Sequence, residues 1–117
     1  MRILILEDEP LTALDLQMAV EAAGHEIADV CHTLRDANRW LSGDIDLDFA
    51  FLDIDLPDGK SFAVATAFDA RRVPFAFVSA SKQGEVPANL RHALFISKPY
   101  GHAAIRNSLD TAGRLAC

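Results

Sequence analysis

Three carboxylate side chains of this sequence stand where an apolar segment ends. Glu7 and Asp8 follow the apolar residues 3–6, and Asp53 follows the apolar residues 49–52. Such runs, each closed by a turn, are typical of parallel strands buried on both faces. The carboxyl ends of these strands form the ligand-binding edge of an open α/β sheet. Like charges brought together there need a cation, and Mg²⁺ prefers one or two carboxylates plus a phosphate oxygen. The three acids therefore predict a Mg²⁺ site.

Two more polar side chains close the later apolar segments. Ser79 follows residues 73–78, and Lys98 ends the segment that begins with residues 93–96. A carboxylate nucleophile beside Mg²⁺, a hydroxyl and an ammonium group is suited to transfer of a phosphoryl group onto an aspartate. This arrangement predicts phosphoryl chemistry at Asp53, assisted by Ser79 and Lys98.

Five short apolar segments, which alternate with helical patterns, must position these groups. Alternation of this kind predicts an α/β fold, in which a five-stranded parallel sheet carries helices on both faces. Right-handed crossovers favour the strand order 2-1-3-4-5 of the doubly wound, flavodoxin-like arrangement. In that order the first and third strands are neighbours, which brings the three acids to one place. The expected strands are residues 2–6, 25–32, 49–52, 73–78 and 93–96.

Local signals predict the first helix and its apolar face. Pro10 is compatible with the first turn of a helix, and Gly24 is a suitable residue just beyond the last turn. Leu11, Leu14 and Met18 repeat at helical spacing between them. These three side chains are therefore expected to form the apolar face of the helix.

Two later segments differ in how strongly they favour a helix. Thr33 and Asp36 resemble a capping box that opens a short helix before Gly43. Residues 81–92 contain Gly84 and Pro87 and show weak periodicity, so the fourth helix is predicted to be short or disordered. A disordered segment there would be expected to become ordered on phosphorylation.

Length and composition indicate one domain, residues 1–117, without an output domain. The net charge is −6, and residues 1–59 carry −11 whereas residues 60–117 carry +5. An acidic chain with scattered basic residues argues against nucleic-acid binding. No apolar run is long enough to span a membrane. Two cysteines give neither a disulfide framework nor metal-ligand spacing, so a reducing cytoplasm is expected.

The polar groups and their surroundings resemble the receiver domain of two-component response regulators. The resemblance covers essentially all 117 residues. It is carried by the first strand with its acids, by the turn after the third strand, and by the ends of the fourth and fifth strands. The matching segments are Ile3-Leu4-Ile5-Leu6-Glu7-Asp8-Glu9-Pro10, Asp53 with Leu56-Pro57 and Gly59, Ser79-Ala80, and Lys98-Pro99.

The resemblance implies a phosphoacceptor and a set of Mg²⁺ ligands. Asp53 would accept a phosphoryl group from a sensor histidine kinase or a histidine phosphotransfer protein. Asp8 and Asp53 would bind Mg²⁺ through their carboxylates. Glu7 would act through water, and Asp55 would contribute its backbone carbonyl oxygen.

The resemblance also implies a switch and a partner surface. Ser79 would hydrogen-bond the phosphoryl group, Lys98 would pair with it, and Phe95 would be the aromatic residue that turns inward with Ser79. The segment from Phe77 to Ser81 is similar to the FAT GUY receivers, with Ala80 in place of their glycine. A four-helix phosphotransfer domain would dock on residues that flank the site: Leu11, Thr12, Asp15, Pro99 and Tyr100.

The function expected from these features is that of a stand-alone response regulator. It would signal by binding another protein, or it would drain phosphoryl groups from a shared kinase, and it would not be a conventional enzyme. A pseudo-receiver that binds its partner without phosphorylation is one alternative. A second is a haloacid-dehalogenase-like phosphatase, in which Asp53 and Asp55 would form an Asp-X-Asp motif with Asp55 as general acid.

Overall fold

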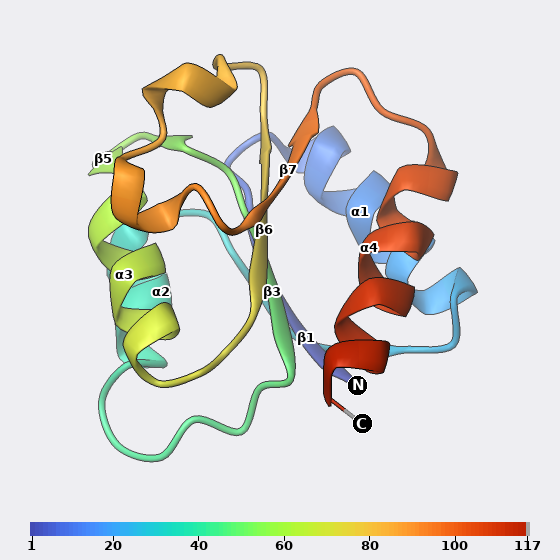
Figure 1. Cartoon of the computed structure of the whole chain (residues 1–117). Helices are drawn as coiled ribbons and strands as arrows, with labels where there is room; N and C mark the ends of the chain where they lie inside the picture. The colour runs from blue at the N-terminus through green and yellow to red at the C-terminus, as the bar shows by residue number, and fades with distance from the viewer. Residues whose placement is uncertain (117) are drawn as a thin grey trace.

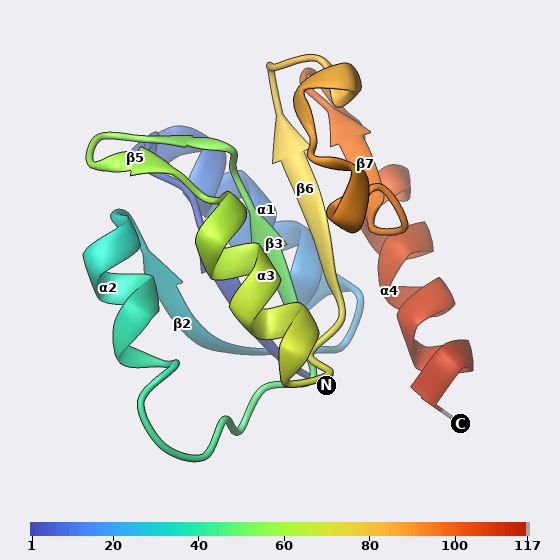
Figure 2. The same cartoon turned by 60° about the vertical axis from the view of Figure 1, so that its left-hand side comes forward.

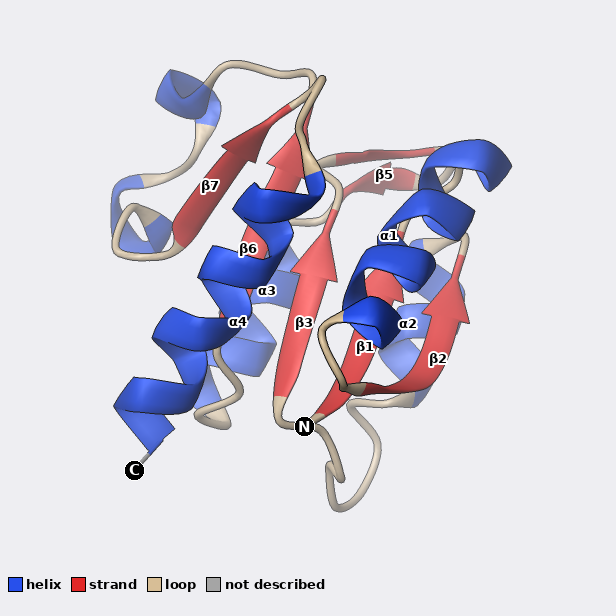
Figure 3. Ribbon diagram, turned by 90° about the vertical axis from the view of Figure 1, so that its right-hand side faces the viewer, coloured by secondary structure: helices blue, strands red, loops and turns tan. Residues whose placement is uncertain are grey.

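The computed structural model describes residues 1–116, with side-chain surroundings through residue 113. Its centre is a parallel sheet of five strands in the order β2-β1-β3-β6-β7 (Figure 3). Counted as the five main strands, this is the predicted order 2-1-3-4-5, and the α/β fold is confirmed. The strands are β1 (Arg2–Leu6), β2 (Glu26–Cys31), β3 (Phe49–Leu52), β6 (Phe75–Ser79) and β7 (Leu94–Ser97).

Four α-helices cover the two faces of the sheet (Figure 1). On one face α1 and α4 pack together, and on the other α2 and α3 do so. Each face has its own apolar core, and β1 and β3 contribute to both. Because β1 and β3 are covered on both sides, their apolar runs are continuous rather than alternating. The helices are α1 (Pro10–Ala22), α2 (Leu34–Arg39), α3 (Phe62–Ala70) and α4 (His102–Ala116).

The predicted start of α2 and end of α1 are confirmed, whereas α2 ends at Arg39, earlier than the predicted stop at Gly43. The side chain of Thr33 accepts a hydrogen bond of 3.1 Å from the backbone amide of Asp36 at the start of α2. Gly24 lies just beyond α1 with a φ of 88°, a conformation that glycine adopts without strain. None of the described helices combines the length and the apolar character needed to cross a membrane.

The apolar face predicted for α1 is not the face that packs on the sheet. Leu11, Leu14 and Met18 are 76%, 52% and 56% exposed. The side chains that face the core are smaller or lie between them: Ala13, Leu16, Ala19 and Val20. The prediction was wrong because α1 carries two apolar stripes, and spacing alone does not say which of them faces the sheet.

The fourth helix of the expected fold is short, as predicted. Two 3-10 turns, η1 (Gln83–Glu85) and η2 (Ala88–Leu90), replace it between β6 and β7. Val86 and Leu90 are 2% and 0% exposed and hold the segment against the core. Of the two alternatives, the structure therefore has a short, packed segment rather than a disordered one.

A hairpin that the sequence did not reveal follows β3. Its strands are β4 (Asp55–Leu56) and β5 (Gly59–Lys60), paired antiparallel. The hairpin reaches from the carboxyl end of β3 towards α2 (Figure 2). There Asp58 accepts hydrogen bonds from the first backbone amides of α2, at 2.9 Å from Leu34 and 3.1 Å from Arg35. The turn after Asp53 is thus fixed to a neighbouring helix.

Candidate functional site

Three of the predicted metal ligands meet at the carboxyl edge of the sheet. Carboxylate oxygens of Glu7, Asp8 and Asp53 all lie within 4.8 Å of one another. Glu7 and Asp53 are buried, at 1% and 7% exposed, whereas Asp8 is exposed. Pairing of β1 with β3 causes this convergence, because Leu6 lies opposite Leu52 and the acids follow these partners. A cluster of hard oxygen donors with one open side suits Mg²⁺.

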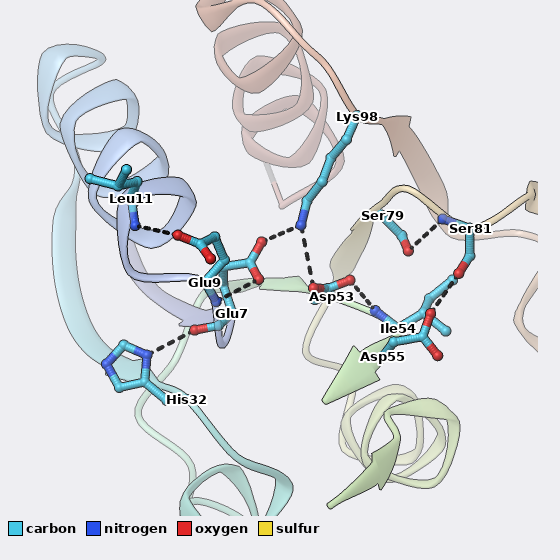
Figure 4. Close-up of polar contacts among 10 residues, drawn as sticks. All are labelled: Glu7, Glu9, Leu11, His32, Asp53, Ile54, Asp55, Ser79, Ser81 and Lys98. Atoms are coloured by element: carbon cyan, nitrogen blue, oxygen red, sulfur yellow. Dashed lines mark hydrogen bonds and ion pairs between the residues drawn. The ribbon is translucent and has the colours of Figure 1, made fainter. Parts of the chain in front are cut away.

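Lys98 supplies the positive charge of the cluster. Its Nζ donates a hydrogen bond to Oε1 of Glu7 and lies 3.3 Å from Oδ2 of Asp53 (Figure 4). Burial acts to lower the pKa of Lys98, but the hydrogen bond from its ammonium group to Glu7 and the charge of Asp53 raise that pKa overall. One ammonium group therefore contacts two of the three carboxylates, so the cluster keeps an excess of negative charge that a divalent cation would offset.

The backbone fixes the orientation of Asp53. Its amide donates a 2.8 Å hydrogen bond to the carbonyl oxygen of Leu6, which continues the pairing of β3 with β1 beyond the last strand residue. Its Oδ1 accepts a 2.7 Å hydrogen bond from the amide of Ile54. The other oxygen, Oδ2, faces Lys98. This second oxygen is the one that remains available for chemistry.

Burial makes Glu7 an unusually weak acid. Desolvation raises the pKa of Glu7 to about 7, and Asp53 adds to this rise, while the hydrogen bond from Lys98 opposes it. In the absence of a cation, Glu7 is therefore partly protonated near neutral pH. Binding of a cation at the three carboxylates would favour the ionised form and release this proton.

The raised pKa of Glu7 predicts that folding stability depends on pH. The pKa of Glu7 is raised from 4.5 to about 7 in the folded protein, so Glu7 stabilises the fold fully below pH 4.5 and this contribution is lost as the pH rises to 7. With EDTA present, we expect the wild type to lose more thermal stability between pH 5 and pH 7.5 than Glu7→Gln does. Excess Mg²⁺ should reduce the difference. Identical pH slopes for the two proteins in EDTA would contradict the prediction.

The predicted hydroxyl, Ser79, is buried at the end of β6 and is 1% exposed. Its Oγ accepts a 3.1 Å hydrogen bond from the amide of Ser81. Ser81 in turn donates from its own Oγ to Oδ2 of Asp55 at 2.6 Å, and Asp55 also accepts from Lys60 (Figure 4). Ser81 and Lys60 were not among the site residues predicted from the sequence. Only the hairpin pairing of Asp55 with Lys60, which has no clear sequence signal, could have indicated them.

The remaining predicted residues lie around this edge. Phe95 is partly buried on β7, with its ring centre 6.5 Å from that of Phe77. The five residues predicted to bind a partner line one shallow pocket of about 500 Å³, together with Ala80 and Lys98. Those five residues are Leu11, Thr12, Asp15, Pro99 and Tyr100. The structure thus joins the predicted partner surface to the acidic cluster through Lys98.

Comparison with known proteins agrees with this geometry. No protein-family model matches the sequence. The chain is 36% identical to the phyllosphere-induced regulator PhyR of Methylorubrum extorquens over 116 residues, which cover 94% of this chain. The chain spans only 42% of the length of that relative.

Solved structures resemble the chain over nearly its whole length. The response regulatory domain of mrkE from Klebsiella pneumoniae is 26% identical, with a TM-score of 0.86 and coverage of 98% of this chain and 97% of that domain. The response regulator TrrA of Thermotoga maritima, solved in complex with Mg²⁺ and BeF, shares the fold at 19% identity and a TM-score of 0.78, with 95% and 97% covered. Fold, acidic cluster and similarity agree: the chain belongs to the receiver domains of response regulators, the modules of two-component signalling.

Proposed function

We propose that Asp53 accepts a phosphoryl group from a sensor histidine kinase or a histidine phosphotransfer protein, with Mg²⁺ as cofactor. The observation that carries the proposal is the meeting of Glu7, Asp8 and Asp53 beside Lys98 at the carboxyl edge of the sheet. The acceptor module would then signal by binding another protein or drain phosphoryl groups from a shared kinase.

The chemistry follows from the groups present. Oδ2 of Asp53 attacks the phosphorus of the donor, and the bond from phosphorus to the donor's leaving atom breaks, with its electron pair staying on that atom. Lys98 lies 3.3 Å from Oδ2 and would pair with the transferred phosphoryl oxygens. Ser79 would donate a hydrogen bond to them. Mg²⁺, held by Asp8, Asp53 and the backbone carbonyl of Asp55, with Glu7 acting through water, would neutralise charge on the same oxygens.

The experiment that tests the proposal uses the smallest donor. The protein is incubated with Mg²⁺ and acetyl phosphate and its intact mass is measured. A gain of one phosphoryl group that hydroxylamine removes supports an acyl phosphate on a carboxylate. If the small donor fails, candidate kinases are tried. A folded protein that stays unmodified with every donor would favour the phosphorylation-independent binding module.

The haloacid-dehalogenase alternative is not supported. That motif should end the first strand, whereas Asp53 ends the third strand along the chain. The carboxylate of Asp55, which would have to be the general acid, is held by Lys60 and Ser81. These hydrogen bonds keep the pKa of Asp55 below its usual value, which is the opposite of what a proton donor needs.

The exposed stripe on α1 supports a helical partner. Leu11, Leu14 and Met18 are each more than half exposed, and Leu11 also lines the pocket next to Lys98. Exposed apolar side chains at this spacing along one helix favour packing against another helix. The phosphotransfer domain of a kinase, which is a helical bundle, would therefore dock along α1 with its histidine directed at Asp53.

A substitution on the stripe separates docking from chemistry. Leu11→Asp should leave phosphorylation by acetyl phosphate unchanged, because the Leu11 side chain is 76% exposed on α1 and is not one of the three clustered acids. The rate of transfer from a histidine donor should fall about tenfold or more, as expected for a central apolar contact of an interface. Both rates follow from intact-mass time courses, with Glu21→Asp on the last turn of α1 as the control. If Leu11→Asp and wild type accept the phosphoryl group from the histidine donor at equal rates, the partner does not dock on the Leu11 stripe of α1.

A further inference from the structure

Behind the acidic cluster, a chain of hydrogen bonds joins the end of β6 to the β4–β5 hairpin. It begins at the Ser79 hydroxyl, which accepts from the amide of Ser81 at 3.1 Å. It continues through the Ser81 hydroxyl, which donates to Oδ2 of Asp55 at 2.6 Å. Figure 4 shows the Ser79 hydroxyl between Asp53 and Ser81, and the Ser81 side chain pointing down to the Asp55 carboxylate. We call the contact between Ser81 and Asp55 the clasp.

The acceptor end of the clasp is held in place by the hairpin. Asp55 lies opposite Lys60 in the β4–β5 pairing, and the Lys60 ammonium group binds the other carboxylate oxygen, Oδ1. At the hairpin tip, Asp58 is bound to the first amides of α2. Both oxygens of Asp55 are therefore occupied on a segment that is itself anchored, so Oδ2 is a fixed acceptor for Ser81.

In the hydrogen bond between Ser79 and Ser81, the Ser79 hydroxyl is the acceptor, and this decides what its own proton can do. A hydroxyl group has one proton to donate and two lone pairs that accept. Because Ser79 accepts from the Ser81 amide, its own proton remains free for a different partner. Among the described residues, no hydrogen bond uses that proton. The amide of Ser81 thus fixes the position of the Ser79 oxygen and leaves its donor free.

We propose that Ser81 is a positioning residue: the clasp holds its amide on Ser79, so that the Ser79 hydroxyl is preoriented to donate to a phosphoryl group on Asp53. This inference rests on the proposed function, since it needs a phosphoryl group or its mimic on Asp53. Preorienting a donor removes the cost of ordering it when the ligand arrives. The clasp is also open to solvent, because the Asp55 side chain is 52% exposed. Its effect is therefore expected to be modest, about threefold to tenfold in affinity, in keeping with one hydrogen bond.

The test measures binding of beryllium fluoride, a phosphoryl mimic, in excess Mg²⁺ by isothermal titration calorimetry. Ser81→Ala should bind the mimic about threefold to tenfold more weakly than wild type. Ser81→Thr keeps the hydroxyl and should restore the affinity. Titration with Mg²⁺ alone should give the same affinity in all three proteins, because Ser81 contacts none of the three carboxylates. General damage to the site would instead weaken Mg²⁺ binding as well.

A double-mutant cycle identifies the contact itself. Asp55→Ala removes the acceptor but keeps the backbone carbonyl, so it should weaken mimic binding as much as Ser81→Ala does. The double variant should be no weaker than either single variant, because the two residues act through one contact. Lys82→Ala is the matched control, because Lys82 is an exposed neighbour of Ser81 that takes no part in the clasp.

The possible outcomes separate the two proposals. Binding of the mimic by wild type with no loss in Ser81→Ala, or losses that add in the double variant, would overturn the clasp and leave the proposed function standing. Failure of Ser81→Thr to recover the affinity would also overturn it. A wild type that binds Mg²⁺ but never the mimic would contradict the proposed function itself, and the inference would fail with it.

Discussion

Asp53→Asn is expected to abolish the hydroxylamine-labile phosphoryl adduct completely. The substitution keeps the size and shape of the side chain, and its amide oxygen can still accept from the amide of Ile54, as Oδ1 now does at 2.7 Å. What it removes is the anionic oxygen beside Lys98, which is the nucleophile in the proposed reaction. Intact-mass spectrometry with Mg²⁺ and acetyl phosphate compares the two proteins directly.

Asp53→Asn should also raise the melting temperature in EDTA, which a loss of the fold could not do. Asp53 is one of the causes of the raised pKa of Glu7, because two carboxylates in one buried place repel each other. In EDTA, Asp53→Asn should therefore melt at a higher temperature than wild type, while its stabilisation by Mg²⁺ should be smaller. A variant that melts lower in EDTA and also lacks the adduct would leave loss of fold as the explanation.

Asp55→Asn is the matched control for the adduct. Only the backbone carbonyl of Asp55 is assigned to the metal, and the new amide oxygen can still accept from Ser81. The adduct should therefore form in this variant. An adduct in Asp53→Asn, or its loss in Asp55→Asn, would reassign the acceptor and revive the reading in which Asp55 takes part in acid catalysis.

Lys98→Met is expected to have the second largest effect. The substitution keeps an unbranched side chain but removes the donor that contacts both Glu7 and Asp53. Loss of one charged donor to the transferring group should slow phosphorylation by about 100-fold. Two carboxylates then lose their partner, at a cost of about 1–3 kcal/mol in the free energy of unfolding. This cost is below that of a fully buried pair, because the Lys98 side chain is 21% exposed.

The pH dependence of this variant provides an independent check. The hydrogen bond from Lys98 is the largest influence that lowers the pKa of Glu7, so its removal should shift that pKa further up and steepen the loss of stability above pH 5 in EDTA. The pH dependence of stability in Lys98→Arg should lie between those of wild type and Lys98→Met, because arginine keeps the charge with a different donor geometry. Chemical denaturation at several pH values measures the stability of both variants and of wild type. An unchanged phosphorylation rate in Lys98→Met would contradict the assigned role.

The sheet and its acids were predictable because burial leaves a strong signal. Strands covered on both faces must be apolar throughout, so β1 and β3 could be recognised from the sequence and their order followed from the handedness of crossovers. Once the order was known, Glu7, Asp8 and Asp53 had to meet. The meeting of the three acids was therefore predicted by topology, and the motifs shared with receiver domains predicted the role of each residue.

The features that the sequence did not show depend on tertiary contacts, which leave no local pattern in the sequence. Helix α1 has two apolar stripes, and the packing of Leu16 and Val20 against the sheet, which decides between them, is a tertiary effect. The β4–β5 hairpin has two residues per strand, too few for a periodic pattern. The contact of Ser81 with Asp55 depends on that hairpin, so it could not be seen before the hairpin was.

The strand order also separates the charge of the molecule. Residues 1–59 carry −11 and form β1, β2 and β3, whereas residues 60–117 carry +5 and include β6 and β7 at the other side of the sheet (Figure 3). The domain is thus an electric dipole directed across the sheet, with the acidic cluster close to its middle. A charged partner approaching from solution would be rotated before contact, and added salt would reduce this orientation by shortening the range of the field. The order of the strands therefore bears on how fast the right encounter forms, as well as on which residues meet.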